Sequence, residues 1–178
     1  MQNVKRVNRS VRVVVLILVA TFVVAVPVLA QDFQALIEEG NRLADEGLYE
    51  EALRAYDRAI AADGEVADAF YNRGTIHMEL GNFQDAISDF DRALELRSDF
   101  GEAMFNRGNA RYQLGSYETA IQDFTAALEL VDNRAEVLHN RGLAHYRLGN
   151  TEDAVVDFTE AIAVREGYVR AYFNRGVV

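Results

Sequence analysis

One short pattern recurs along most of this chain at a fixed spacing of 34 residues. The triplet Asn-Arg-Gly begins at positions 72, 106, 140 and 174. Glycines, alanines and aromatic residues keep the same spacing at Gly47, Gly81, Gly115 and Gly149, at Ala52, Ala86, Ala120 and Ala154, and at Tyr56, Phe90, Phe124 and Phe158. Registers that agree in phase indicate tandem repeats, because a period of roughly 20–50 residues is typical of one supersecondary unit stacked many times.

The period divides the chain into units 33–66, 67–100, 101–134 and 135–168, followed by a partial unit 169–178. Apolar residues within a unit recur at helical spacing, as in the stripe Phe83, Ala86, Ile87, Phe90, Ala93 and Leu94. Gly81 separates this stripe from an upstream one and is suited to a left-handed cap at a helix C-terminus. We therefore predict two antiparallel helices per unit, A then B, and an all-α solenoid of stacked pairs.

These residues resemble the tetratricopeptide repeat family, whose 34-residue unit is a helix–turn–helix. The family motif is supplied in the second unit by Phe70, Gly74, Gly81, Phe83, Ala86, Phe90 and Ala93, at positions 4, 8, 15, 17, 20, 24 and 27. The resemblance covers about 33–178 and implies a right-handed α-solenoid whose A helices line a concave groove. The proline that the family often has at position 32 is replaced by Gly64, Ser98, Asp132 and Glu166, so the turns between units must use other chemistry.

Three units carry an arginine at position 7, where the family commonly has an apolar residue. The same units have an aspartate at position 23, which gives the pairs Arg73–Asp89, Arg107–Asp123 and Arg141–Asp157. The first unit has neither. A partly buried arginine needs a carboxylate partner, so we expect each pair to join helices A and B of one unit. The alternative is the aspartate of the preceding unit, which would give Arg175 the partner Asp157.

The resemblance also implies that positions 5 and 6 of helix A face the groove. These positions hold Tyr71, Phe105, His139 and Phe173, and Asn72, Asn106, Asn140 and Asn174. An asparagine side chain can bond both the N–H and the C=O of an extended peptide, and aromatic rings add apolar contact. We predict a partner-binding groove here. The alternative is that the asparagines only bond neighbouring helices.

Charge limits the classes of partner. The net charge of the chain is −10, but residues 1–30 hold four bases and no acid, which leaves 14 bases against 28 acids, or −14, in residues 31–178. Such a surface repels nucleic acid. Acids at position 2 of the A helices, Asp68, Glu102 and Glu136, argue against a clamp for a C-terminal carboxylate. A neutral or basic protein or peptide is therefore the predicted partner.

The sequence contains no motif of a catalytic, phosphate-binding or metal-binding site. It has no cysteine, and it lacks a phosphate-binding loop, a nucleophile elbow and a histidine pair spaced for a metal. Of the three histidines, His139 belongs to the groove positions above, and we read His77 and His145, which both occupy position 11, as helix-interface residues. The sequence accordingly predicts no catalytic residue, no cofactor and no metal.

The N-terminus predicts export. Residues 1–12 are basic, and the eighteen residues from Val13 to Ala30 carry no charge. This is typical of a secretory signal peptide cleaved after Ala30; the alternative is an uncleaved membrane anchor over residues 13–30. Both place the repeats outside the cytoplasm, secreted, periplasmic or anchored, with membrane contact only through the N-terminal segment.

Taken together, the sequence predicts a non-catalytic protein–protein interaction scaffold that binds its partner in the concave groove. Two alternatives remain open, because only the partial unit 169–178 covers the end of the last complete unit. The chain could self-associate through that open C-terminal face as a structural assembly module, or it could be a fragment of a larger repeat protein.

Overall fold

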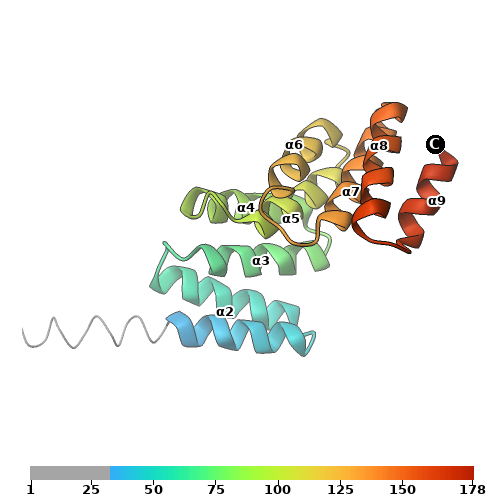
Figure 1. Cartoon of the computed structure of the whole chain (residues 1–178). Coiled ribbons are helices and arrows are strands. Elements are labelled where there is room, and N and C mark those ends of the chain that lie inside the picture. The colour runs from blue at the N-terminus through green and yellow to red at the C-terminus, as the bar shows by residue number, and fades with distance from the viewer. Residues whose placement is uncertain (1–32) are drawn as a thin grey trace, which may run out of the picture.

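The computed structural model describes residues 33–178, so the export signal or anchor expected at residues 1–30 lies outside the described part. Residues 33–45 are helical, and eight helices follow: α2 (Tyr49–Ala62), α3 (Ala67–Glu79), α4 (Phe83–Leu96), α5 (Gly101–Gln113), α6 (Tyr117–Ala127), α7 (Arg134–Arg147), α8 (Thr151–Val164) and α9 (Val169–Val177). None of the described residues is in a strand. The predicted all-α solenoid is confirmed, and its helices stack along the molecule in chain order (Figure 1).

Glycine sets the turn inside each unit. Gly47, Gly81, Gly115 and Gly149 have φ between 75° and 82°, the left-handed region that only glycine enters without steric cost. Behind Gly81, the N–H of Asn82 donates to the carbonyl of His77 at 2.8 Å, which closes a Schellman-type cap. The predicted glycine cap is therefore confirmed, and each A helix reverses into its B helix within about three residues.

The turns between units use polar and extended residues in place of proline. After α2, Asp63 is extended, and its carboxylate accepts the N–H of Glu65 at 3.0 Å. The residues that follow α4 and α8, Arg97 and Arg165, are also extended, so three of the B helices end in the same backbone conformation. The helix that lacks this ending is α6, which stops earlier in the unit than the others.

The helices form two rows with different spacing. We call residues 33–45, α3, α5, α7 and α9 the inner row, and α2, α4, α6 and α8 the outer row. Successive inner-row helices contact each other, α3 with α5, α5 with α7 and α7 with α9, whereas no outer-row helix contacts the next within the described residues. The inner row therefore lies on the more tightly curved, concave side of the solenoid.

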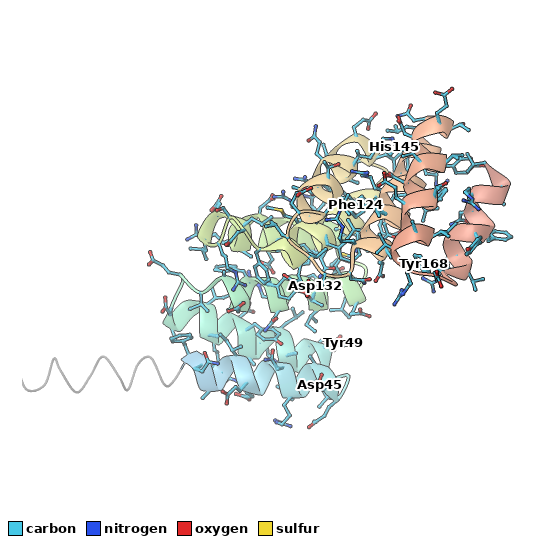
Figure 2. The ribbon with its side chains drawn as sticks, in the orientation of Figure 1. Asp45, Tyr49, Phe124, Asp132, His145 and Tyr168 are labelled. Atoms are coloured by element: carbon cyan, nitrogen blue, oxygen red, sulfur yellow. The ribbon has the colours of Figure 1, made fainter. Side chains whose placement is uncertain are left out.

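The core runs between the two rows along the whole stack. Its fully buried members are mainly the repeated alanines and the position-24 rings of the outer row, Tyr56, Phe90, Phe124 and Phe158, each no more than 2% exposed. Small residues let the helices approach, and large rings fill the remaining space. Phe124 is labelled within the stack in Figure 2. Among residues 33–178, no helix has both the length and the apolar character that a bilayer crossing requires.

Candidate functional site: the paired dipeptides and the concave face

The three central units share one contact between their two helices. A consecutive Arg and Gly on the inner helix meet a consecutive Asp and Phe on the outer helix, and we call this the Arg-Gly/Asp-Phe contact. Its members are Arg73-Gly74 with Asp89-Phe90, Arg107-Gly108 with Asp123-Phe124, and Arg141-Gly142 with Asp157-Phe158. This contact fixes how each A helix sits on its B helix, and so it positions the concave face.

The ionic half of the contact is bidentate. Arg73 donates from Nη2 to Asp89 Oδ1 at 2.6 Å and from Nε to Oδ2 at 2.9 Å. Arg107 reaches Asp123 at 2.6 and 3.0 Å, and Arg141 reaches Asp157 at 2.6 and 3.0 Å. The three aspartates are only 2–5% exposed. The structure thus brings together each pair within its own unit, in the geometry that makes arginine–carboxylate pairs strong.

The steric half of the contact depends on glycine. A Cβ added to Gly74, Gly108 or Gly142 would lie 2.7–2.9 Å from the nearest carbon of the Phe ring in the same unit. Real Cβ atoms do not approach a ring that closely, so only glycine admits the ring at this point. The role inferred for the third residue of the Asn-Arg-Gly triplet, close packing of the two helices, is what the structure shows.

The arginines also reach back to the preceding unit, at a position that the sequence analysis did not single out. Arg73 donates to Asp57 at 2.6 Å and Arg107 to Asp91 at 2.6 Å. The equivalent partners of Arg141 and Arg175 are threonines, Thr125 at 3.1 Å and Thr159 at 3.3 Å. The inter-unit partner is therefore position 25 and not position 23. An acidic residue at 57 and 91 in the same register was the available signal.

Position 11 of the inner helix supplies a further neighbour for the buried aspartates. Arg111 donates to Asp123 at 2.7 Å, and the Nε2 atoms of His77 and His145 lie 3.9 Å from Asp89 and Asp157. The interpretation of His77 and His145 as helix-interface residues agrees with these positions. Arg111 was not predicted as a site residue. Its one signal in the sequence is that it occupies position 11, where the second and fourth units have histidine.

The surroundings keep the arginines charged. The bonds that Arg73 donates to Asp89 raise the pKa of Arg73 despite its burial. Burial lowers the pKa of Arg107, but the bonds to Asp123 and Asp91 outweigh it, and the net shift is upward. Hydrogen bonds to Asp157 likewise raise the pKa of Arg141. The three guanidinium groups therefore stay positively charged in any ordinary solution.

The asparagines of position 6 line the inner row and link successive units. Asn72 donates to Asn41 at 2.9 Å, Asn106 to the Tyr71 hydroxyl at 3.2 Å, and Asn140 to Asn109 at 2.8 Å. The alternative that these amides bond neighbouring helices is thus seen directly. Asn174 donates in the same way to His139 Nε2 at 2.8 Å, and each such bond uses one of the two N–H groups of the amide.

The position-5 residues do not form one exposed row. Tyr71 and Phe105 are half-buried and stack on Phe90 and Phe124, with ring centroids 6.0 Å apart in both cases. Phe173, at the end of the solenoid, is 69% exposed.

His139 is buried at 5% exposure, between Phe158 at 5.7 Å and Tyr168 at 5.3 Å. Burial lowers its pKa, so the ring is neutral near pH 7 and holds the helices together; it lines none of the hollows described below.

The inner row carries at least two hollows. The first, of about 280 Å³, lies between residues 33–45 and α3, and its lining includes Asn41, Asp45, Tyr71, Asn72 and Thr75. The second, of about 220 Å³, lies between α5 and α7 and is lined by Asn109, Tyr112, Gln113, Asn140 and Leu143. Amides and tyrosines dominate both, which suits a peptide backbone better than a long apolar side chain.

A larger hollow of about 460 Å³ lies between residues 33–45 and α2. Its charged lining is already tied in exposed ion pairs, Arg58 with Glu39 at 2.8 Å and Arg54 with Glu51 at 3.1 Å. We do not assign a partner to it.

Charge is distributed unevenly along the inner row. At positions 2 and 13 of the inner helices, the acids Asp45, Glu79 and Glu102 are exposed on the N-terminal half, whereas the exposed bases Arg147 and Arg170 belong to α7 and α9. Arg147 also donates to the Tyr112 hydroxyl at 3.2 Å at the edge of the second hollow. Within residues 33–178 no cluster of three or more His, Asp or Glu side chains is arranged to hold a metal ion.

Comparison with known proteins agrees with this architecture. Two models described as tetratricopeptide repeat match the chain, one over residues 37–98 and 71–135 and the other over residues 135–168. A search of curated proteins gives no match.

Three solved structures illustrate the similarity. MamA is 25% identical with a TM-score of 0.75, over 78% of this chain and 81% of that chain. YrrB, titled a TPR protein with an unusual peptide-binding site, is 25% identical with a TM-score of 0.76, over 88% and 80%. The first TPR of Spaghetti (RPAP3), bound to the HSP90 peptide SRMEEVD, is 30% identical with a TM-score of 0.65, over 67% and 94%.

Proposed function

The chain belongs to the tetratricopeptide repeat family, a fold that generally serves protein interaction without catalysis, and on that premise we propose that it binds a protein or peptide partner along its concave face. The observation that carries the proposal is the pair of amide- and tyrosine-lined hollows on the inner row. A backbone laid along this row meets N–H and C=O groups at a regular spacing, because the asparagines recur once per unit.

The asparagines hold the groove together and bind the partner at the same time. Asn106 illustrates the division: one N–H is given to Tyr71, and the other N–H and the carbonyl oxygen remain for an extended peptide. Because this bond already holds the amide in one rotamer, less side-chain conformational entropy is lost when the partner binds. The inter-unit bonds therefore support the binding role.

The partner that we propose is neutral or basic. The first hollow includes the exposed carboxylate of Asp45 and no base, and Glu79 and Glu102 lie exposed along the same half of the inner row. A basic segment is attracted to this half, whereas the exposed bases at positions 2 and 13 of the inner helices, Arg147 and Arg170, lie at the far end. Complementary charge mainly sets which partner is accepted and how fast it arrives.

We further propose that binding takes place outside the cytoplasm, since residues 1–30 have the pattern of a signal or anchor. N-terminal sequencing of the protein recovered from the exported fraction tests this. Gln31 as the first residue supports a cleaved signal, and recovery only in the cytoplasm contradicts the proposal.

Titration of the full chain with fluorescent extended peptides that differ only in net charge tests the function. Neutral and basic peptides should bind, and Asn106→Ala should weaken binding roughly tenfold, the effect of one or two hydrogen bonds lost in a desolvated site. Gln122→Ala is the matched control, because it removes an exposed amide from α6 in the outer row. Equal losses for both variants, or preference for acidic peptides, would contradict the proposal.

A further inference from the structure

One register of the inner row changes its charge steadily along the solenoid. Position 13, near the C-terminal end of each inner helix, holds Asp45, Glu79, Gln113 and Arg147 in the four units. All four residues are exposed. The register is exposed even in the units that have a neighbour on both sides, so the repeat itself directs these side chains outward. This edge of the concave face is therefore negative in the first two units, neutral in the third and positive in the fourth.

The charges at the two ends of this edge are not neutralised by other side chains of the fold. Within the described part of the chain, none of Asp45, Glu79 and Arg147 takes part in a salt bridge. By contrast, Asp68, near the other end of α3, is paired with Arg97 at 2.6 Å. Unpaired charges of opposite sign at the two ends favour a ligand whose own charges are arranged in the complementary order.

Apolar character increases in the same direction. Position 9 is polar in the first three units and is leucine, Leu143, in the fourth. Leu143 lines the second hollow together with Tyr112, whose ring meets that of Tyr117 edge-on at 5.3 Å. Arg147 lies over both rings, at 6.0 and 5.9 Å, and its Nε donates to the Tyr112 hydroxyl at 3.2 Å. The second hollow thus offers apolar and aromatic contact beside a guanidinium group whose two Nη atoms can still bind a carboxylate.

We propose that the concave face binds an extended segment with a fixed order of charges: basic residues on the first two units, and an apolar residue beside an acidic one on the fourth. The bases meet Asp45 and Glu79, the apolar side chain enters the second hollow against Leu143, and the acid meets Arg147. The two hollows are two inner-helix steps apart, roughly 20 Å at about 10 Å per step. An extended chain spans this distance in about six residues.

This inference rests on the proposed binding at the concave face and adds the order of charges in the partner. Two fluorescein-labelled peptides of identical composition test it on the full chain. Each has two lysines, one leucine, two aspartates and a spacer of about six serine and glycine residues. In the segregated peptide the lysines are at one end and the leucine and aspartates at the other, whereas in the alternating peptide the lysines and aspartates alternate. Both peptides have the same net charge, so only the order differs.

Fluorescence anisotropy at low salt should show the segregated peptide binding roughly fivefold more tightly, the effect of a few exposed charge pairs. The difference should shrink at high salt, because these charges are open to solvent. Arg147→Gln should remove most of the preference, and Arg147→Glu should shift it toward a peptide with lysines at both ends. Arg54→Gln and Arg54→Glu make the same charge changes on α2 in the outer row and should keep the preference. Circular dichroism of the Arg147 variants should match the unaltered chain, since the residue is exposed.

Disulfide trapping locates the two ends of the bound segregated peptide. The chain has no cysteine, so Asn82→Cys and Asn150→Cys each place a single thiol at equivalent exposed turn positions of the second and fourth units. A peptide with a cysteine at its basic end should crosslink faster at position 82, and one with a cysteine at its acidic end faster at position 150.

The outcomes separate this inference from the groove proposal. Equal binding of the segregated and alternating peptides overturns the order of charges and leaves binding at the concave face standing. Crosslinking that is reversed, or that does not depend on which end carries the cysteine, does the same. Binding of neither peptide overturns both proposals.

Discussion

The central units and α9 carry the same Arg-Gly dipeptide in different surroundings. In the unit of α5 and α6, Arg107 holds Asp123 with two bonds, and Gly108 lies against the ring of Phe124. In α9, Arg175 contacts a threonine and Gly176 faces open space. The same dipeptide therefore contributes differently to the stability of the fold in different copies of the repeat. The neighbour that each copy meets decides how far the same residues stabilise the fold.

The first unit gives the comparison a third case. It has Glu39 and Ala55 where the central units have Arg and Asp, and its ion pair, Arg58 with Glu39 at 2.8 Å, has side chains that are 57% and 41% exposed. Its glycine is still necessary, because a Cβ on Gly40 would lie 2.5 Å from the Tyr56 ring. The steric half of the contact thus extends further along the chain than its ionic half.

The largest effect is expected from Asp123→Ala. This change leaves Arg107 and Arg111 partly buried without the carboxylate that both hold, and breaking a buried pair from one side costs about 3 kcal/mol or more. Urea unfolding followed by circular dichroism measures it. Asp132→Ala, which removes an exposed carboxylate from a turn, should change the free energy of unfolding by less than about 0.5 kcal/mol. Equal effects of Asp123→Ala and Asp132→Ala on the free energy of unfolding would contradict the role assigned to the buried carboxylate.

Alanine at two equivalent glycines should have effects of opposite sign. Gly108→Ala places a Cβ 2.7 Å from Phe124 and should destabilise the fold by about 1–3 kcal/mol, the usual cost of overpacking. Gly176→Ala meets nothing within 4 Å and should raise the helix content of α9, because alanine is favoured over glycine in a helix by about 0.5–1 kcal/mol. Unfolding curves and helical circular dichroism measure both effects. A loss of stability in both variants would be inconsistent with the absence of atoms within 4 Å of a Cβ at Gly176.

Acid should loosen the junction between α7 and α9. His139 accepts from Asn174 at 2.8 Å, and burial, aided by Arg170, lowers its pKa below 6.5 in the folded chain. As the pH falls through 6.5, the unfolded chain takes up a proton that the folded chain resists, so this group makes folding less favourable at lower pH.

Stability measured between pH 7 and 5 checks this prediction. Substituting His139→Phe, which copies Phe105 of the preceding unit, should flatten the slope in that range. A slope that the substitution leaves unchanged would exclude His139 as its source.

The smallest effect is expected in the first unit. Arg58→Ala removes an exposed ion pair, which contributes about 0–1 kcal/mol at most. The unfolding free energy should therefore change far less than with Asp123→Ala. A loss of stability as large as that of Asp123→Ala would show that the exposure of an ion pair does not determine its contribution to stability.

The repeat register made most of the fold predictable. A 34-residue period places the helices, the left-handed glycines and the small residues, because each position faces the same neighbour in every unit. The pairing of Arg107 with Asp123 could be expected because a partly buried base needs an acid. Its second bond to Asp91 was missed although Asp57 and Asp91 share one register, since that bond also depends on how far one unit is rotated on the next. The burial of His139 was missed for the same reason: Tyr168 comes from the following turn.

The most direct test of the concave face uses the absence of cysteine from the chain. Gln113→Cys places one thiol in the second hollow, and Gln122→Cys places one on α6 in the outer row, both at exposed positions. The rate of maleimide labelling is measured with and without a saturating neutral or basic peptide that binds the full chain. We predict slower labelling at position 113 and an unchanged rate at position 122. Protection at 122 alone, or at neither position, would contradict binding along the inner row.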